Sequence, residues 1–260
     1  MEVKRICAAY WSATGNTDKT VNTIAETLAE KLGVPLERRN FTRPSDRAED
    51  LSFTGGDLVV FGMPTYAGKL PNKMLPYVQQ QIHGNGALAV GVVTFGNRSY
   101  DNSLAELCAA LEADGFHTVA GGAFACRHAF TDALADGRPD WDDKRQMGEF
   151  AARIADKVKD LTDIPAPVAV PGDAAAPYYV PKGTDGQPVK FLTRTVDGAI
   201  VRETHVHLPG WRPLDGCRSL HDASLDKAQT EIFILLICLR LDKFADNFFQ
   251  LSKYRVYICK

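Results

Sequence analysis

The stretch Ser12-Ala13-Thr14-Gly15-Asn16-Thr17 decides how the first two thirds of the sequence fold. It follows an apolar run at residues 6–10 and precedes a segment whose apolar residues recur at helical spacing, so it predicts a turn from a strand into a helix. Such a turn offers free backbone N–H groups and the positive end of a helix dipole, here beside three hydroxyl side chains. We therefore expect this turn to bind a phosphate group.

The residues that this turn lacks narrow the choice of ligand. It carries neither the Gly-x4-Gly-Lys-Ser/Thr loop of nucleoside triphosphate sites nor the Gly-x-Gly-x-x-Gly of dinucleotide sites. A hydroxyl-rich loop without a lysine suits one terminal phosphate monoester, whose charge N–H and O–H donors can meet. The hexapeptide alone is also compatible with Ser, Thr and Asn residues that do no more than cap a helix.

Composition excludes several classes of protein. The chain has 260 residues, 45% of them hydrophobic, and a formal net charge of -2, which gives no positive field for nucleic acid. The eight apolar residues at 232–239 are too few for a membrane span, which needs roughly 20 residues. The N-terminus lacks the pattern of a signal peptide, so we expect a cytoplasmic protein. The six cysteines form no Cys-x-x-Cys pair, and we expect no metal site.

Apolar runs at 57–62 and 87–93 are typical of strands buried on both faces of a parallel sheet. Further strands are expected at 6–10, 35–41 and 116–125, with helices between them and a last helix from about residue 142. This alternation predicts an α/β domain over residues 1–164, a doubly wound five-stranded parallel sheet with strand order 2-1-3-4-5.

The strand order brings three loops to one crevice, because strands 1, 3 and 4 are neighbours and end at the same edge. The loops are residues 12–17, 63–71 and 94–102. FMN needs a phosphate cradle and two walls for a planar ring. The first loop suits the phosphate, Tyr66 suits one wall, and Tyr100 or Phe95 suits the other. No catalytic side chain is expected. The residues expected to bind FMN are Ser12, Ala13, Thr14, Gly15, Asn16, Thr17, Pro64, Thr65, Tyr66, Ala67, Gly68, Thr94, Phe95, Gly96, Asn97, Tyr100 and Asp101.

These three loops, in this order and spacing, resemble the flavodoxin-like superfamily over about residues 3–164. The resemblance implies an FMN-binding protein of electron transfer or flavin-dependent reduction, with a redox partner protein or a small-molecule acceptor. The stretch 127–140 is similar to proteins in which a flavodoxin domain is fused to a bacterial-type ferredoxin, whose Cys-x2-Cys-x2-Cys-x3-Cys-Pro run binds iron–sulfur clusters. Here Cys217, Cys238 and Cys259 are 21 residues apart, so we expect no cluster.

Two alternatives stay open at this point. One is an NAD(P)H-dependent quinone or nitro-compound reductase on the same fold, and the other is a non-catalytic remnant or binding domain. His128 is compatible with a proton donor at the rim of the crevice and with a hydrogen-bonding anchor.

The rest of the sequence departs from the first domain in composition. Residues 165–188, rich in Pro, Gly and Ala, are expected to be a linker, and residues 189–260 a C-terminal extension of irregular structure. Within it, strands at 189–192 and 199–206 would form a hairpin around Asp197-Gly198. An apolar helix at 224–251 would favour self-association or packing on the first domain.

Overall fold

The computed structural model describes residues 2–129, 134–180, 187, 194–196, 199–201 and 254–258. The chain forms two compact units, one of residues 1–178 with 252–260 and the other of residues 179–251. The helix expected at 224–251, the strand expected at 189–192 and the three cysteines at 217, 238 and 259 lie outside the described residues.

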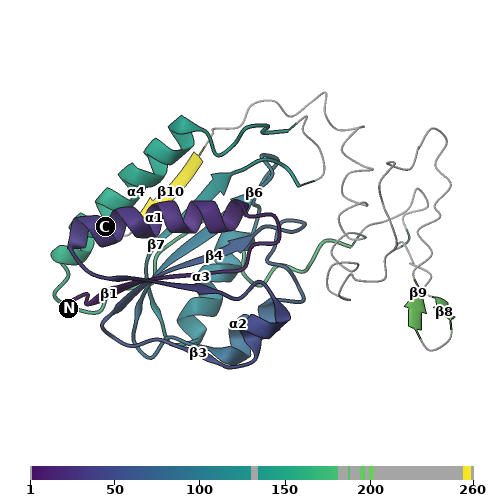
Figure 1. The fold of residues 1–260 in the computed structure, drawn as a ribbon, viewed down its shortest axis with the longest axis horizontal. Coiled ribbons are helices and arrows are strands. Elements are labelled where there is room, and N and C mark those ends of the chain that lie inside the picture. Colours follow the sequence, from purple (N-terminus) through teal and green to yellow (C-terminus); the bar gives the residue numbers. More distant parts are fainter. Residues whose placement is uncertain are drawn as a thin grey trace. The chain divides into compact units, whose positions relative to one another are not determined.

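A parallel sheet forms the centre of the first unit (Figure 1). Its five parallel strands are β1 (Arg5–Tyr10), β2 (Leu36–Asn40), β4 (Asp57–Pro64), β6 (Leu88–Phe95) and β7 (His117–Ala125). They lie in the order β2-β1-β4-β6-β7, which confirms the predicted order 2-1-3-4-5. A sixth strand that the sequence did not indicate, β10 (Tyr254–Ile258), pairs antiparallel with β7.

Helices cover both faces of this sheet. One face carries α1 (Asn16–Leu32) and α4 (Trp141–Lys159), and the other carries α2 (Leu75–Gln81) and α3 (Ser103–Ala113) (Figure 1). Within the described part of the chain, no helix is both long enough and apolar enough to cross a bilayer.

Shorter elements complete the description. A 3-10 turn η1 (Pro44–Arg47) and the small parallel pair β3 (Leu51–Ser52) and β5 (Ile82–His83) lie in the first unit. In the second unit, β8 (Arg194–Val196) and β9 (Ala199–Val201) pair antiparallel on either side of the expected turn at 197–198.

The hydrophobic core is divided into two layers by the sheet, and β4 contributes to both. Val59 and Phe61 belong to the layer under α2 and α3, while Leu58 and Val60 belong to the layer under α1 and α4. All four side chains are fully buried. A strand with both faces buried has a continuous apolar sequence rather than an alternating one, which is why this run could be recognised.

Helix α1 sits close to the sheet because Gly62 of β4 has no side chain. A Cβ placed on Gly62 would lie 2.1 Å from Cγ2 of Val21 and 3.0 Å from Cγ2 of Thr17. Val21 is β-branched and lies within α1, so its side chain has essentially one rotamer and cannot turn away. The first turns of α1 therefore rest directly on the backbone of β4.

We predict that Gly62→Ala destabilises the protein by about 1–3 kcal/mol, because the added methyl group forces α1 away from the sheet. Urea unfolding followed by circular dichroism measures the change. Gly148→Ala in α4 is the matched control, since its added Cβ meets no atom within 4 Å. Replacing a helical glycine by alanine should leave stability unchanged or raise it by about 0.5–1 kcal/mol. Equal stability of Gly62→Ala and wild type would contradict the close packing.

Asp114, at the C-terminal end of α3, has a buried carboxylate oxygen without a hydrogen-bond partner among the described residues. Burial raises the pKa of Asp114 from 3.8 to about 6, and the nearby His83 opposes this shift. Because the pKa of Asp114 is higher in the folded than in the unfolded protein, the folded protein binds this proton more tightly. The charged form therefore costs stability above about pH 6, and this cost disappears as the pH falls towards 4.

We predict that Asp114→Asn is more stable than wild type above pH 6, and that its advantage shrinks between about pH 6 and pH 4. Thermal unfolding midpoints of both proteins across this range measure the difference, in which the titration of all other groups cancels. Asp163→Asn, which replaces an exposed carboxylate, is the control and should give no comparable gain in stability. An Asp114→Asn advantage that does not change with pH would show that burial of the charge is not the cause.

Candidate functional site

The first loop presents a row of unused backbone donors. Gly15 has a left-handed conformation with φ of 82° and ends the loop directly before α1. The five N–H groups of residues 13–17 have no hydrogen-bond partner among the described residues. The groups on either side are used, since the N–H of Ser12 donates to Oγ1 of Thr42 and the N–H of Asp18 donates to Oγ of Ser12. An unused set of this kind at a helix N-terminus suits an anion.

A buried pair of hydroxyl groups lies behind this loop. Oγ1 of Thr17 and Oγ1 of Thr94 are 2.8 Å apart, and both residues are buried. One hydroxyl donates to the other, so the pair retains one further O–H donor. The bond joins the start of α1 to the end of β6, and the first loop is thereby fixed against the third.

The second loop begins at the end of β4 and is joined to β6. Pro64 lies opposite Thr94 in the sheet, and the N–H of Thr65 donates to the carbonyl of Thr94 at 2.7 Å. Tyr66 and Lys69 then exchange two backbone hydrogen bonds of 2.8 and 3.1 Å around Ala67 and Gly68.

The turn between Tyr66 and Lys69 is tight and strained. Both central residues have positive φ, 51° for Ala67 and 82° for Gly68. Two successive residues with positive φ between paired strands define a type I′ turn. Alanine adopts this region at a cost, so the surroundings must hold the turn in place. The ring of Tyr66 lies 5.8 Å from that of Trp11 in an edge-on arrangement, and burial raises the pKa of Tyr66.

The third loop packs directly on this turn. The N–H of Asn102 donates to the carbonyl of Gly68 at 2.8 Å, and the hydroxyl groups of Thr65 and Ser103 are 2.7 Å apart. A Cβ added to Gly68 would lie 2.9 Å from Cβ of Asp101. The second and third loops are therefore joined by hydrogen bonds and close packing.

Two aromatic side chains of the third loop pack on each other. The rings of Phe95 and Tyr100 are 5.5 Å apart, and Tyr100 is buried and part of the core layer under α3. We expected Tyr100, with Phe95 beside it, to cover one side of the flavin ring. In the described structure Tyr100 is buried and Phe95 is half-buried, and their contact with FMN stays a prediction.

The segment after β7 closes the other side of the first and third loops. Nδ2 of Asn16 donates to the carbonyl of Arg127 at 3.0 Å. A Cβ added to Gly96 would lie 2.3 Å from the imidazole of His128, so this ring packs on the backbone of the third loop. Burial lowers the pKa of His128 below 6.5, which keeps the imidazole neutral at pH 7. The role of His128 stays a prediction.

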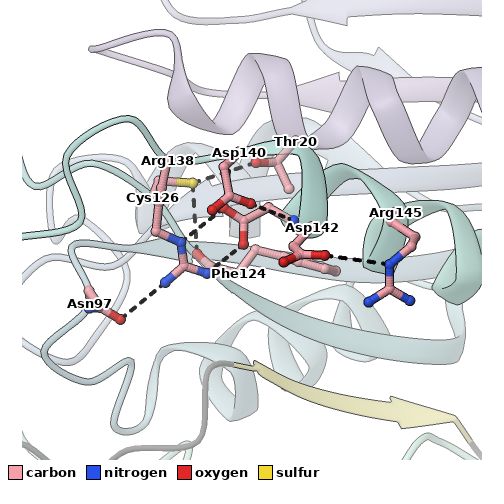
Figure 2. Close-up of polar contacts among 9 residues, drawn as sticks. Thr20, Asn97, Phe124, Cys126, Arg138, Asp140, Asp142 and Arg145 are labelled. Carbon is pink, nitrogen blue, oxygen red and sulfur yellow. Dashed lines mark hydrogen bonds and ion pairs between the residues drawn. The ribbon is translucent and has the colours of Figure 1, made fainter.

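A buried ion pair of Arg138, which Figure 2 labels, fixes the end of this segment to α4. Nε and Nη2 of Arg138 donate to the two carboxylate oxygens of Asp143, at 2.9 and 2.5 Å. The side chains are 11% and 0% exposed, and the hydrogen bonds to Asp143 raise the pKa of Arg138. The third guanidinium nitrogen, Nη1, lies 3.4 Å from Oδ1 of Asn97. Arg138 thus connects the third loop to the N-terminus of α4.

A polar cavity of about 880 Å³ lies beside α1 and the 136–139 segment. Of the residues predicted to bind FMN, Thr14 and Asn16 line it. The cavity is therefore largely separate from the junction of the three loops. Among the described residues, no group of three His, Cys, Asp or Glu side chains is arranged to hold a metal ion.

The structure brings the predicted residues together at the carboxyl edge of β1, β4 and β6, and their contact with FMN stays a prediction. Sequence reasoning missed Trp11, Lys69, Glu106 and Arg138 as parts of this region. Trp11 could have been found, because it directly precedes the first loop at a strand end. The roles of Lys69 and Arg138 depend on partners in distant segments, and no local pattern indicates them.

The first unit is an α/β domain with a doubly wound parallel sheet, and three loops lie at the carboxyl edge of this sheet. The family model described as the flavodoxin domain matches residues 7–107, from β1 into α3, and this range holds all three loops. Residues 7–107 are therefore similar to the flavodoxin domain. No curated protein sequence matched the chain.

Solved structures similar to this chain include two flavodoxins and an oxidoreductase. A flavodoxin from the domain Archaea is 14% identical, with a TM-score of 0.44 over 60% of this chain and 99% of that one. The flavodoxin of Streptococcus pneumonia TIGR4 is 18% identical, with a TM-score of 0.42 over 59% and 99%. An NADH:FMN oxidoreductase in its apo form is 13% identical, with a TM-score of 0.44 over 62% and 94%.

We predict that Arg138→Met destabilises the protein by about 3–5 kcal/mol, because it leaves the buried carboxylate of Asp143 without its counter-charge. Urea unfolding measures the loss. Arg145→Met in α4 is the matched control, since Arg145 pairs with Asp142 and Glu149 through side chains that are 46–61% exposed. Exposed pairs contribute about 1 kcal/mol or less. Equal losses of unfolding free energy in the two variants would show that the buried Arg138–Asp143 pair contributes no more than an exposed pair.

Proposed function

We propose that the protein binds FMN at the junction of the three loops and uses it in electron transfer or flavin-dependent reduction. The observation that carries this proposal is the row of five unused N–H groups in the first loop beside the buried Thr17–Thr94 hydroxyl pair. The family match supports it, since the matched range contains all three loops.

The donors of the first loop fit a phosphate monoester. The N–H groups of residues 13–17 supply most of the hydrogen bonds, and the α1 dipole favours the negative charge. The hydroxyl of Ser12 accepts a hydrogen bond from the N–H of Asp18, so its own proton is available to an oxygen of the ligand. The Thr17–Thr94 pair has a second proton to donate. These donors can meet the charge of the phosphate although the first loop contains no lysine.

The other two loops provide groups suited to a flat, polar-edged ring. Tyr66 offers an aromatic face, and Trp11 packs edge-on against it and limits its movement. The N–H groups of Ala67 and Gly68, and those of Gly96 and Asn97, have no partner among the described residues. They are donors for the oxygen and nitrogen atoms of the ring edge. Burial raises the pKa of Tyr66, so its hydroxyl stays neutral and adds no charge beside the ring.

When bound, FMN supplies the redox chemistry, as it accepts one electron or a hydride. The protein holds the phosphate, orients the ring and sets the polarity around its edge. We assign no catalytic side chain. An electron acceptor or donor, either a redox protein or a small molecule, completes the reaction.

We predict that Thr17→Val weakens FMN binding about tenfold or more and leaves riboflavin binding unchanged. The hydroxyl pair would donate to the charged phosphate, and a hydrogen bond to a charged group contributes about 1.5–3 kcal/mol. Riboflavin lacks the phosphate. Quenching of flavin fluorescence measures both dissociation constants. Thr23→Val is the matched control, since Thr23 donates to the carbonyl of Lys19 further along α1, away from the loop.

A protein that takes up no FMN and shows no flavin absorbance would contradict the proposed function. Equal weakening of FMN and riboflavin by Thr17→Val would place the phosphate elsewhere. With flavin bound, addition of NADH or NADPH without another reductase separates the two activities. A carrier leaves the nicotinamide unoxidised, whereas a reductase consumes it.

A further inference from the structure

A second buried ion pair lies directly beside the second loop. Nζ of Lys69 is 2.9 Å from Oε1 of Glu106 in α3, and the two side chains are 5% and 8% exposed. A buried charge is costly unless it is paired and its remaining hydrogen-bonding capacity is satisfied. The contacts of this pair therefore show what it holds together.

The ammonium group of Lys69 is satisfied by a segment that follows α4 in the sequence. Besides Glu106, it donates to the carbonyls of Ala174 and Ala176, each at 2.8 Å. The two carbonyls use hydrogen-bonding capacity of the ammonium group that the ion pair with Glu106 leaves available. The ring of Tyr178 lies 5.5 Å from Nζ. We call residues 173–178 the strap.

The strap is also attached to the second and third loops by hydrogen bonds that do not involve Lys69. The hydroxyl of Tyr178 donates to the carbonyl of Leu70 at 3.0 Å. The N–H of Asp173 donates to Oδ1 of Asn102 at 2.9 Å. The strap thus contacts both loops that would surround the flavin ring.

The other side of the ion pair holds the strained turn. Oε2 of Glu106 accepts from the N–H of Leu70 at 2.7 Å, while Oε1 pairs with the side chain of Lys69. Glu106 therefore fixes the two residues that follow the turn at Ala67 and Gly68. Because Ala67 has a positive φ, this turn needs such support to keep its shape.

We propose that Lys69 is a positioning residue of the flavin site, and that it couples docking of the strap to the shape of the turn that carries Tyr66. This proposal rests on the proposed function. A docked strap completes the coordination of the Lys69 ammonium, which stabilises the Lys69–Glu106 pair and the turn. FMN, which would contact the same turn, then favours the docked strap, since coupling between two binding events is reciprocal.

The test uses the full chain with Lys69→Met and Glu106→Gln combined, so that no single buried charge remains. Hydrogen exchange of residues 170–178 in the protein without flavin should become faster in this variant. Its FMN dissociation constant should rise at least about fivefold, the lower end of typical coupling effects. Addition of FMN should slow exchange of the strap in wild type and have a smaller effect in the variant. Tyr178→Phe, which removes one hydrogen bond of the strap, should give a smaller change of the same sign.

A control at the amino ends of β1 and β4 distinguishes a specific effect on FMN binding from a general loss of stability. Arg5→Met with Asp57→Asn removes a half-buried pair, in which Arg5 donates to Asp57 at 2.8 and 2.9 Å. This control should lower the unfolding midpoint without changing the FMN dissociation constant or exchange of the strap.

The outcomes distinguish this proposal from the function on which it rests. If wild type binds FMN and the Lys69 double variant binds it equally well, the coupling is wrong and the proposed function stands. The same holds if FMN leaves exchange of the strap in wild type unchanged. If wild type binds no FMN, the proposed function fails and the coupling falls with it.

Discussion

The close seat of α1 on β4 is the contact on which the candidate site depends. Without a side chain at Gly62, the first turn of α1 approaches the sheet, and Thr17 reaches Thr94 at the end of β6. A larger residue at Gly62 would lift the turn, and the hydroxyl pair would lose its geometry. The close packing of α1 on β4 also sets the direction of the unused N–H groups at residues 13–17, because these residues lead directly into α1.

The three loops are held by polar contacts as well as by the apolar packing of side chains such as Leu70 and Tyr100. They lie at the carboxyl edge of the sheet, where directional bonds add to this packing. Two buried ion pairs are among these polar contacts. Lys69 with Glu106 supports the second loop, and Arg138 with Asp143 supports the segment beside the first and third. Each pair connects a loop near the site to a segment later in the chain.

The sheet and the site edge could be predicted because their signals are local. The runs at 57–62 and 87–93 are continuous and apolar, as strands with two buried faces require, and the strand order follows from the count and the crossovers. The three loops could then be placed together without any long-range information. The burial of Tyr100 could not be predicted, because it depends on contacts such as the one with Phe95 that composition does not reveal.

The segment 165–178 has the composition of a linker but packs on the rest of the first unit. Its Pro, Gly and Ala residues are typical of a linker, yet Val168 is buried and the strap is bonded to both loops. The groups that dock it on Lys69 are the carbonyls of Ala174 and Ala176, which every sequence possesses. The information lies in the lysine, 105 and 107 residues away from these alanines.

An ion pair at Lys69 is not explained by stability alone. Well-packed apolar residues of similar volume often stabilise a protein as much as a buried pair does. An apolar side chain at position 69 would, however, donate no hydrogen bond to the two strap carbonyls. It would also leave Glu106, which accepts from the N–H of Leu70, without its ion-pair partner. The lysine therefore selects one arrangement of turn and strap among the many that apolar packing would tolerate. That selection suits a loop which must present one fixed surface to a ligand.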